Sequence, residues 1–164
     1  MEYILKEFLS YEKLKETADF LFRENENLDN KFYLVQTKYG TLGFTYYHLG
    51  IKPSIILRNG ILFMGFGTSI IIYNIFQKNL LYKITDTMHI VYELQYNSYF
   101  EYIVCICELC ILTFNSKGKL LWENGVQDPI YDYKIKEKSV EIQFEDKTIL
   151  SLSLDNGGVV FFKK

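Results

Sequence analysis

The stretch Ile61-Leu-Phe-Met-Gly-Phe-Gly-Thr-Ser-Ile-Ile-Ile-Tyr-Asn74, followed by Leu80-Leu-Tyr-Lys83, has a second copy 41 residues later. That copy is Tyr102-Ile-Val-Cys-Ile-Cys-Glu-Leu-Cys-Ile-Leu-Thr-Phe-Asn115, followed by Leu120-Leu-Trp-Glu123. A partial third copy, Thr148–Asp155 and then Val159–Phe162, places Asp155 40 residues after Asn115. Self-similarity at a fixed period identifies an architecture built from one supersecondary unit. Each unit is predicted to be two strands joined by a tight turn, then a short third strand.

The rest of the chain from Lys31 onward supports a β fold. Short β-rich segments alternate with turn residues, and Asn59-Gly60 is the dipeptide that best tolerates the two positive φ angles of a tight hairpin. The 14 Tyr and 13 Phe also favour pleated, half-buried surfaces over helices. We therefore predict an all-β fold, mainly an antiparallel meander of incomplete propeller-like blade units, with one N-terminal α-helix.

The 164 residues are enough for one domain with a conventional hydrophobic core. Ser10 can cap a helix whose apolar residues follow the three-and-four spacing of a single face, and this predicts a helix over about 10–24. The predicted single domain, 1–164, then contains β-hairpins over 31–66 and blade-like repeats over about 61–100, 102–140 and 141–164.

Over about 61–164 the repeat resembles the blades of β-propellers, most closely those of quinoprotein-like propellers. The best copy is Asn115-Ser-Lys-Gly118-Lys-Leu-Leu-Trp122, in which a turn is followed by two apolar residues and an aromatic. The resemblance implies blade units, but closed propellers have about four to eight blades and this chain has residues for about three. The family's quinone cofactor lies on the axis of a complete ring, so no cofactor is implied here.

An open array of blades leaves strand edges and one sheet face without a partner. The N-terminal helix and the hairpin before Ser54 are the expected covers within the chain. A partner protein or a second copy of the chain is the expected cover from outside, so a homo-oligomer is one expectation.

Charge is unevenly distributed, although the net charge is only −2. Residues 39–85 carry four basic side chains and no acidic one, whereas residues 86–133 carry seven acids, Asp86 among them, and two lysines. The small net charge argues against nucleic-acid binding.

The acidic segment is interleaved with tyrosines and favours a basic protein partner. The partner-binding residues predicted from it are Glu93, Glu101, Glu108, Glu123, Asp128, Asp132, Tyr131 and Tyr133. Alternatively, the two segments form solvated faces that attract each other within one fold, or the tyrosines pack on a sheet.

The candidate chemical groups are few. Cys105, Cys107 and Cys110 could form a soft-metal site, but strand alternation places Cys110 opposite the other two unless a bulge intervenes. Buried free thiols are the preferred interpretation, and they suit the cytoplasm.

The two histidines, His48 and His89, lie in strand-like segments without a flanking catalytic motif. No segment is long and apolar enough to predict a membrane helix. The first residues do not have the basic start and the uninterrupted apolar stretch that would predict a signal peptide.

These observations predict a non-enzymatic, cytoplasmic protein-binding module. Small acidic proteins of this type, rich in tyrosine, resemble bacterial immunity proteins, which neutralise a toxin by covering its basic active site. Two alternatives remain open at this point: a small nuclease that uses His48 or His89, and a structural subunit of a β-rich assembly.

Overall fold

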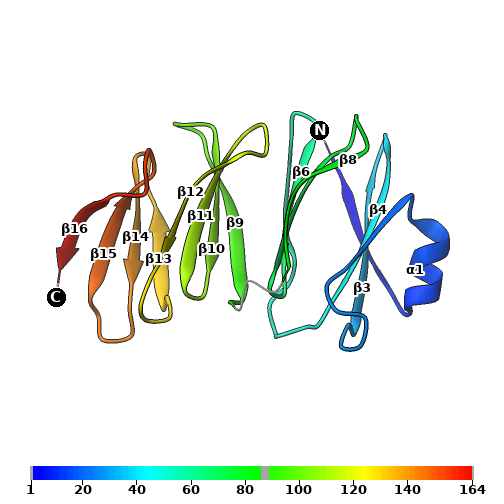
Figure 1. Cartoon of the computed structure of the whole chain (residues 1–164), viewed down its shortest axis with the longest axis horizontal. Helices are drawn as coiled ribbons and strands as arrows, with labels where there is room; N and C mark the ends of the chain where they lie inside the picture. The colour runs from blue at the N-terminus through cyan, green and yellow to red at the C-terminus, as the bar shows by residue number, and fades with distance from the viewer. Residues whose placement is uncertain (1, 86–88, 164) are drawn as a thin grey trace.

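Four four-stranded sheets stand side by side in a row, with one short helix at one end (Figure 1). A computed structural model describes residues 2–85 and 89–163. The strands of the first sheet, in the order β1-β3-β4-β2, are β1 (Ile4–Phe8), β2 (Phe20–Arg23), β3 (Lys31–Thr37) and β4 (Gly40–Tyr46). Helix α1 (Tyr11–Thr17) lies between β1 and β2 in the sequence. The predicted fold class, all-β with one N-terminal helix, is confirmed.

The other three sheets contain their strands in chain order, and all their pairs are antiparallel. The second sheet contains β5 (Ser54–Arg58), β6 (Ile61–Phe66), β7 (Ser69–Asn74) and β8 (Asn79–Ile84). The third contains β9 (Val91–Asn97), β10 (Tyr102–Cys107), β11 (Cys110–Asn115) and β12 (Leu120–Gly125). The fourth contains β13 (Asp132–Ile135), β14 (Ser139–Gln143), β15 (Ile149–Ser153) and β16 (Val159–Lys163). We call β8, β12 and β16 the outer strands.

Three layers of apolar side chains join neighbouring sheets, and the inner sheets contribute to two layers each. On β6, Leu62 and Met64 pack in the layer shared with the first sheet, while Ile61 and Phe63 pack in the layer shared with the third. A strand buried on both faces has no polar face, so its sequence is continuously apolar instead of alternating. This explains why β6 and β7 dominate the apolar pattern of the chain.

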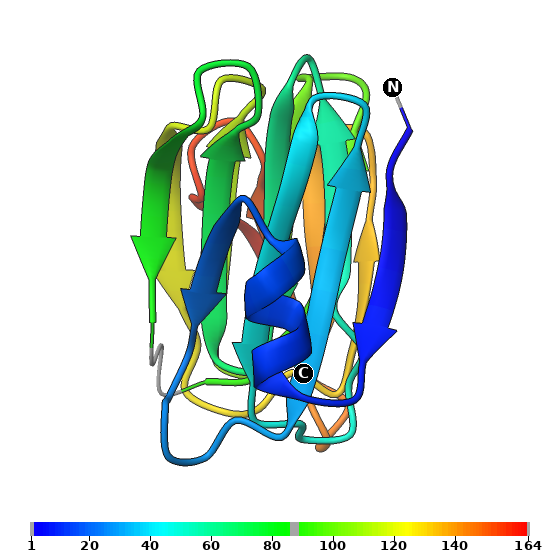
Figure 2. The ribbon, with the colours of Figure 1, turned by 90° about the vertical axis from the view of Figure 1, so that its right-hand side faces the viewer.

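The two ends of the row differ in what covers their outward faces. Helix α1 lies over the outward face of the first sheet (Figure 2), where Leu14 is fully buried and a Cβ on Gly43 would lie 3.1 Å from the Leu14 Cγ. The fourth sheet has no such cover among the described residues. The residues of its outward face are mostly polar, namely Asp132, Lys134, Glu141, Gln143, Ser151 and Ser153. A polar outer face is how terminal repeats of stacked arrays stay in solution.

The helix is shorter than the sequence pattern predicts. It ends at Thr17, Ala18 is extended, and Phe20–Arg23 forms β2, which runs parallel to β4. Phe22 is buried in the first layer and packs edge-on against Phe66, with ring centroids 6.1 Å apart. Pairing with β4 and this burial outweigh the helical spacing, which continues past Thr17 only by coincidence.

The repeat is present, but its boundaries differ from the predicted ones. The sheets cover 54–84, 91–125 and 132–163, so each unit begins one strand earlier than predicted, with β5, β9 or β13. The Asn59-Gly60 hairpin is confirmed between β5 and β6, with φ angles of 48° and 78°. The first sheet escaped prediction as a unit because its strand order and its parallel β2–β4 pair depart from the repeat.

Candidate functional site

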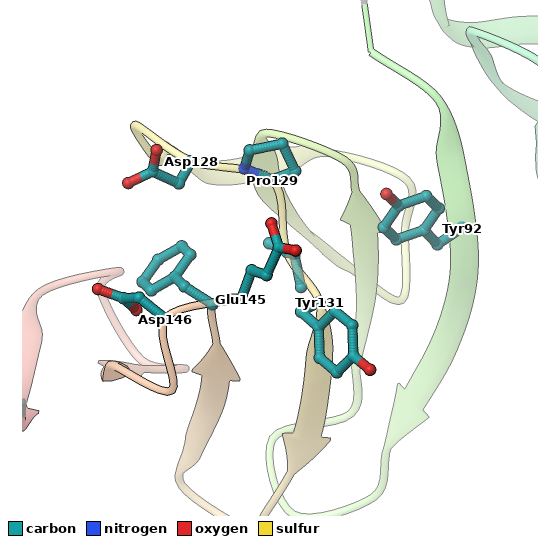
Figure 3. Close-up of a pocket in the computed structure, with 8 residues that line it drawn as sticks. Tyr92, Asp128, Pro129, Tyr131, Glu145 and Asp146 are labelled. Atoms are coloured by element: carbon teal, nitrogen blue, oxygen red, sulfur yellow. The ribbon is translucent and has the colours of Figure 1, made fainter.

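A cavity of about 730 Å³ opens between the third and fourth sheets (Figure 3). Tyr92 on β9 forms one side of it, and the connection from β12 to β13 and the turn from β14 to β15 form the rest. The lining residues are Tyr92, Asp128, Pro129, Ile130, Tyr131, Phe144, Glu145 and Asp146. Acidic and aromatic side chains thus surround one open space.

Backbone hydrogen bonds fix the β12–β13 connection to both sheets. Ile130 N donates to Glu108 O at 2.8 Å on the third sheet, and Tyr131 N donates to Gln143 O at 2.9 Å on the fourth. The Ile130 side chain is buried, whereas those of Asp128 and Tyr131 are exposed. The buried isoleucine therefore anchors the connection and leaves the flanking acidic and aromatic side chains at the cavity.

The β14–β15 turn is ordered by its own residues. Lys147 N donates to Phe144 O at 3.0 Å, and Lys147 has a φ of 69°. The Asp146 carboxylate accepts two hydrogen bonds from Thr148, one from its N–H and one from its hydroxyl, both at 2.8 Å. Asp146 is therefore held in place, while the neighbouring Glu145 side chain is exposed.

The cavity lining has one sign of charge. Among the described residues, the lining contains three carboxylates, those of Asp128, Glu145 and Asp146, and no basic side chain. Burial, together with the Glu108 carboxylate, raises the pKa of the Tyr92 phenol. A concave surface with charges of one sign focuses the field and concentrates ligands of opposite charge. This arrangement suits a cationic group flanked by aromatic rings.

The predicted partner-binding residues do not form one patch. Asp128 and Tyr131 line the cavity, and the Glu108 backbone holds its Ile130. By contrast, Glu93 and Tyr133 are half-buried between the third and fourth sheets, where Tyr133 Oη donates to Glu93 Oε2 at 2.8 Å. Burial and then this hydrogen bond raise the Tyr133 pKa.

The remaining predicted acids lie elsewhere. Glu101 is exposed in the β9–β10 turn, Glu123 is exposed on β12, and Asp132 pairs with Gln143 on the outward face of the fourth sheet. Asp86 of the acidic segment lies outside the described residues. The segment of high negative charge is therefore spread over several surfaces, because successive strand residues point to opposite faces and successive turns to opposite ends.

Glu145 and Asp146 were missed because they lie beyond the acidic segment 86–133. The repeat itself carried the signal. The turn that contains them joins the second and third strands of the fourth sheet, and Glu108 lies in the corresponding turn of the third sheet. Comparing equivalent turns, instead of counting charge along the sequence, would have brought these acids together.

The cysteines share one layer, contrary to the expectation from strand alternation. Cys105, Cys107 and Cys110 are all buried in the layer between the second and third sheets, and the Cys105 and Cys107 sulfurs lie 3.8 Å apart. Cys110 joins them because the Glu108–Leu109 turn begins a new strand, so parity along one strand does not apply. Hydrogen bonding to Cys105 and burial raise the Cys107 pKa, which disfavours the reactive thiolate. In the described part of the chain, no three metal-ligating side chains are arranged to hold a metal ion.

Each histidine lies two residues from the end of a strand. His48 follows β4 in the first sheet, where its Nδ1 lies 3.3 Å from the Tyr46 hydroxyl. His89 precedes β9. Neither is among the residues that line the cavity.

Within residues 2–85 and 89–163, no helix has the length and hydropathy to cross a bilayer.

No family model matches the sequence. No curated protein matches it either. Several solved structures resemble the chain in fold. The computationally designed Ika4 protein aligns with a TM-score of 0.53 and 17% identity over 70% of this chain and 74% of its own. The designed Ika8 protein aligns with a TM-score of 0.52 and 16% identity over 80% of this chain and 46% of its own. The WD40 repeats of RRP9 align with a TM-score of 0.48 and 15% identity over 69% of this chain and 39% of their own. The likeness to the two designed proteins is one of fold alone.

Proposed function

We propose that this chain is a non-enzymatic protein-binding module that receives a basic segment of a partner protein in the cavity between its third and fourth sheets. The observation that carries the proposal is the lining itself, in which three carboxylates and no basic side chain accompany Tyr92, Tyr131 and Phe144. A lysine or arginine side chain inserted there would meet carboxylates and aromatic faces together. Electrostatic attraction would also speed the encounter.

A binding titration with defined peptides tests the proposal. The probe is a hexa-arginine peptide, with hexaglutamate as the peptide of opposite charge, measured by calorimetry at low and high salt. We expect hexa-arginine alone to bind, and more weakly at high salt because screening shortens the range of the attraction. Binding of both peptides, or of neither, would contradict the proposal.

Two double variants with the same charge change locate the site. Asp128→Asn with Glu145→Gln removes two of the three carboxylate charges of the cavity, and we expect it to weaken hexa-arginine binding by about tenfold, as loss of two exposed charge pairs implies. Glu101→Gln with Glu123→Gln removes two exposed acids outside the cavity and is expected to leave binding nearly unchanged. Equal losses in the two variants would assign the attraction to overall charge and not to the cavity.

The more specific form of the proposal is that the partner is a toxin and the chain its immunity protein in a bacterial cytoplasm. Its support is the same electrostatics, since basic active-site clefts are covered by acidic surfaces. The test is capture from a host lysate with the natural sequence and with the Asp128→Asn, Glu145→Gln variant. The immunity form requires a captured protein that is basic, that the double variant fails to retain, and whose own activity is lost in the complex.

A further inference from the structure

The outer strand of the last sheet, β16, exposes apolar residues on both of its faces. The exposed fractions are 64% for Val159, 58% for Val160, 42% for Phe161 and 56% for Phe162. Among the described strands β16 pairs only with β15, so its other backbone edge has no strand partner. Such an edge is a template for pairing with another chain.

Comparison with the other outer strands shows what β16 lacks. The register places Tyr82 of β8, Trp122 of β12 and Phe161 of β16 at equivalent positions, opposite Ile72, Thr113 and Ser151. At the next position β8 has Lys83 and β12 has Glu123, whereas β16 has Phe162. A charge on an edge strand is a common device against edge-to-edge pairing. Only the last of these three outer strands replaces that charge with an aromatic residue.

A β-bulge does not compensate for the missing charge. Bulges twist an edge and can discourage pairing. All three outer strands have the same bulge, which leaves Leu81, Leu121 and Val160 without a direct partner. The bulge is therefore common to the repeat, and the difference between β16 and the other two outer strands lies in the side chains.

We propose that β16 pairs with β16 of a second copy of this chain, antiparallel about a two-fold axis, to join the two fourth sheets into one sheet of eight strands. A charge at the end of the strand favours this arrangement. Lys163 is the last residue of β16. With the two-fold axis at Phe161, the middle residue of the strand, antiparallel pairing places Lys163 of one copy opposite Val159 of the other, whereas parallel pairing in register would place the two Lys163 side chains together. A two-fold axis also makes the contact self-complementary, so assembly stops at two copies.

This inference does not rest on the proposed function, because the β16 edge and the acidic cavity use different side chains for different partners. Sedimentation equilibrium over a range of protein concentrations tests it. We expect the natural sequence to pass from 19.4 kDa to twice that mass as concentration rises. A mass of 19.4 kDa at every concentration up to about 1 mM, a weak-affinity limit, would overturn the proposal.

Lysine substitutions locate the contact. Phe162→Lys restores the charge that the other outer strands carry, and we expect it to raise the dimer dissociation constant by about tenfold or more. Val160→Lys provides a second disruption at a more exposed residue in case the first variant is unstable. Leu121→Lys is the matched control on β12, and we expect its dimer to be unchanged. A dimer that survives both β16 variants, or one that Leu121→Lys dissociates, would overturn the assignment to β16. A thermal melt of each variant confirms that it is folded.

A pair of charged variants tests the direction of pairing. In the antiparallel arrangement Lys163 lies opposite Val159 of the other copy, so we expect Val159→Glu to dimerise more strongly than Val159→Lys, because only the first places opposite charges together. Equal dimerisation of the two variants would show that the antiparallel arrangement is wrong.

Discussion

Gly157 and Gly118 allow neighbouring sheets to approach each other closely, because glycine has no side chain. Each lies in the turn before an outer strand, with φ angles of +73° and +83°. A Cβ on Gly157 would lie 2.8 Å from the Trp122 ring of the preceding sheet, and one on Gly118 would lie 2.8 Å from the Ile72 Cγ2. The turn of one sheet thus presses directly against its predecessor. The same glycine serves two purposes, a left-handed backbone and a close approach between sheets.

Gly157→Ala is expected to destabilise the fold by about 2 to 4 kcal/mol, because it adds a ring clash to the strain of a positive φ. Gly50→Ala is the matched control. Gly50 also has a positive φ, +89°, but no atom lies within 4 Å of the added Cβ, so only about 1 kcal/mol of backbone strain is expected. Urea unfolding of both variants measures the difference. Equal losses would mean that the Trp122 ring moves aside without cost.

Asp19 links the start of β2 to β4 and makes stability depend on pH. Its carboxylate accepts hydrogen bonds from the Thr41 N–H at 2.7 Å and the Thr41 hydroxyl at 3.0 Å, and these lower its pKa below 3.8. A lowered carboxyl pKa contributes stability that is present above the ordinary pKa and is lost as the pH falls through the folded value.

We expect Asp19→Asn to be less stable than the natural sequence at pH 7, with the gap narrowing as the pH falls below 3.8. Denaturant midpoints at pH 7 and at successively lower pH measure the gap. A gap of constant size would show that the loss comes from altered geometry and not from the charge.

Some single residues were predictable and others were not. Asn59-Gly60 was, since the dipeptide itself prefers the backbone of a tight turn. Glu24 was not. Its carboxylate accepts hydrogen bonds from Thr68 N and Ser69 Oγ, both at 2.8 Å, on a turn more than forty residues away. Such a contact depends on how two sheets face each other, which no local pattern records.

At the scale of elements, α1 is held by burial more than by its own length. It has only seven residues, and helices that short are not stable in isolation. Leu14 is its one buried residue and packs onto the first sheet beside Gly43. The helix therefore depends on the sheet that it covers.

We expect Leu14→Ala to cost about 2 to 5 kcal/mol, as removal of a fully buried leucine side chain usually does. Glu16→Ala, at an exposed position of the same helix, should change stability by less than about 0.5 kcal/mol. Both free energies come from urea unfolding. A small loss for Leu14→Ala would mean that the helix can leave the sheet without unfolding it.

The elements show where sequence patterns succeed. Continuous apolar strands and their 41-residue spacing predicted β6, β7, β10 and β11, because burial on both faces leaves a strong signal. The β2 strand was predicted as helix, since Leu21 and Phe22 extend the helical spacing of α1. Its true partner is β4, which pairs with it in parallel and lies more than twenty residues further along the sequence. Local periodicity carries no information about such pairing.

At the scale of the whole molecule, each sheet packs only against its neighbours, so stability is expected to be highest in the middle of the row. The second and third sheets are covered on both faces, whereas the outward face of the fourth is mostly polar and has no covering element among the described residues. Opening of the last sheet would expose only one apolar layer. Opening of the second or third would expose two.

Hydrogen exchange with mass-spectrometric readout measures this gradient. We expect the slowest exchange in β6, β7, β10 and β11 and faster exchange in β13–β16, because local opening costs less at the end of the array. The Phe162→Lys variant is the form to use, so that pairing between copies cannot protect β16. Uniform protection across the four sheets would indicate a single cooperative unit.

The row of sheets also bears on how such a chain can grow. A ring fixes the number of its blades, because every interface angle must change when one is gained or lost. Here the first and fourth sheets lie at opposite ends (Figure 1), so no closure condition links them. Tandem duplication of a segment such as 91–125 with its connection would insert one more layer and would create one new interface, between the face that now packs on the fourth sheet and the face that now packs on the second. Gene-level change in repeat number is therefore compatible with this architecture, with the helix and the polar sheet kept at the ends.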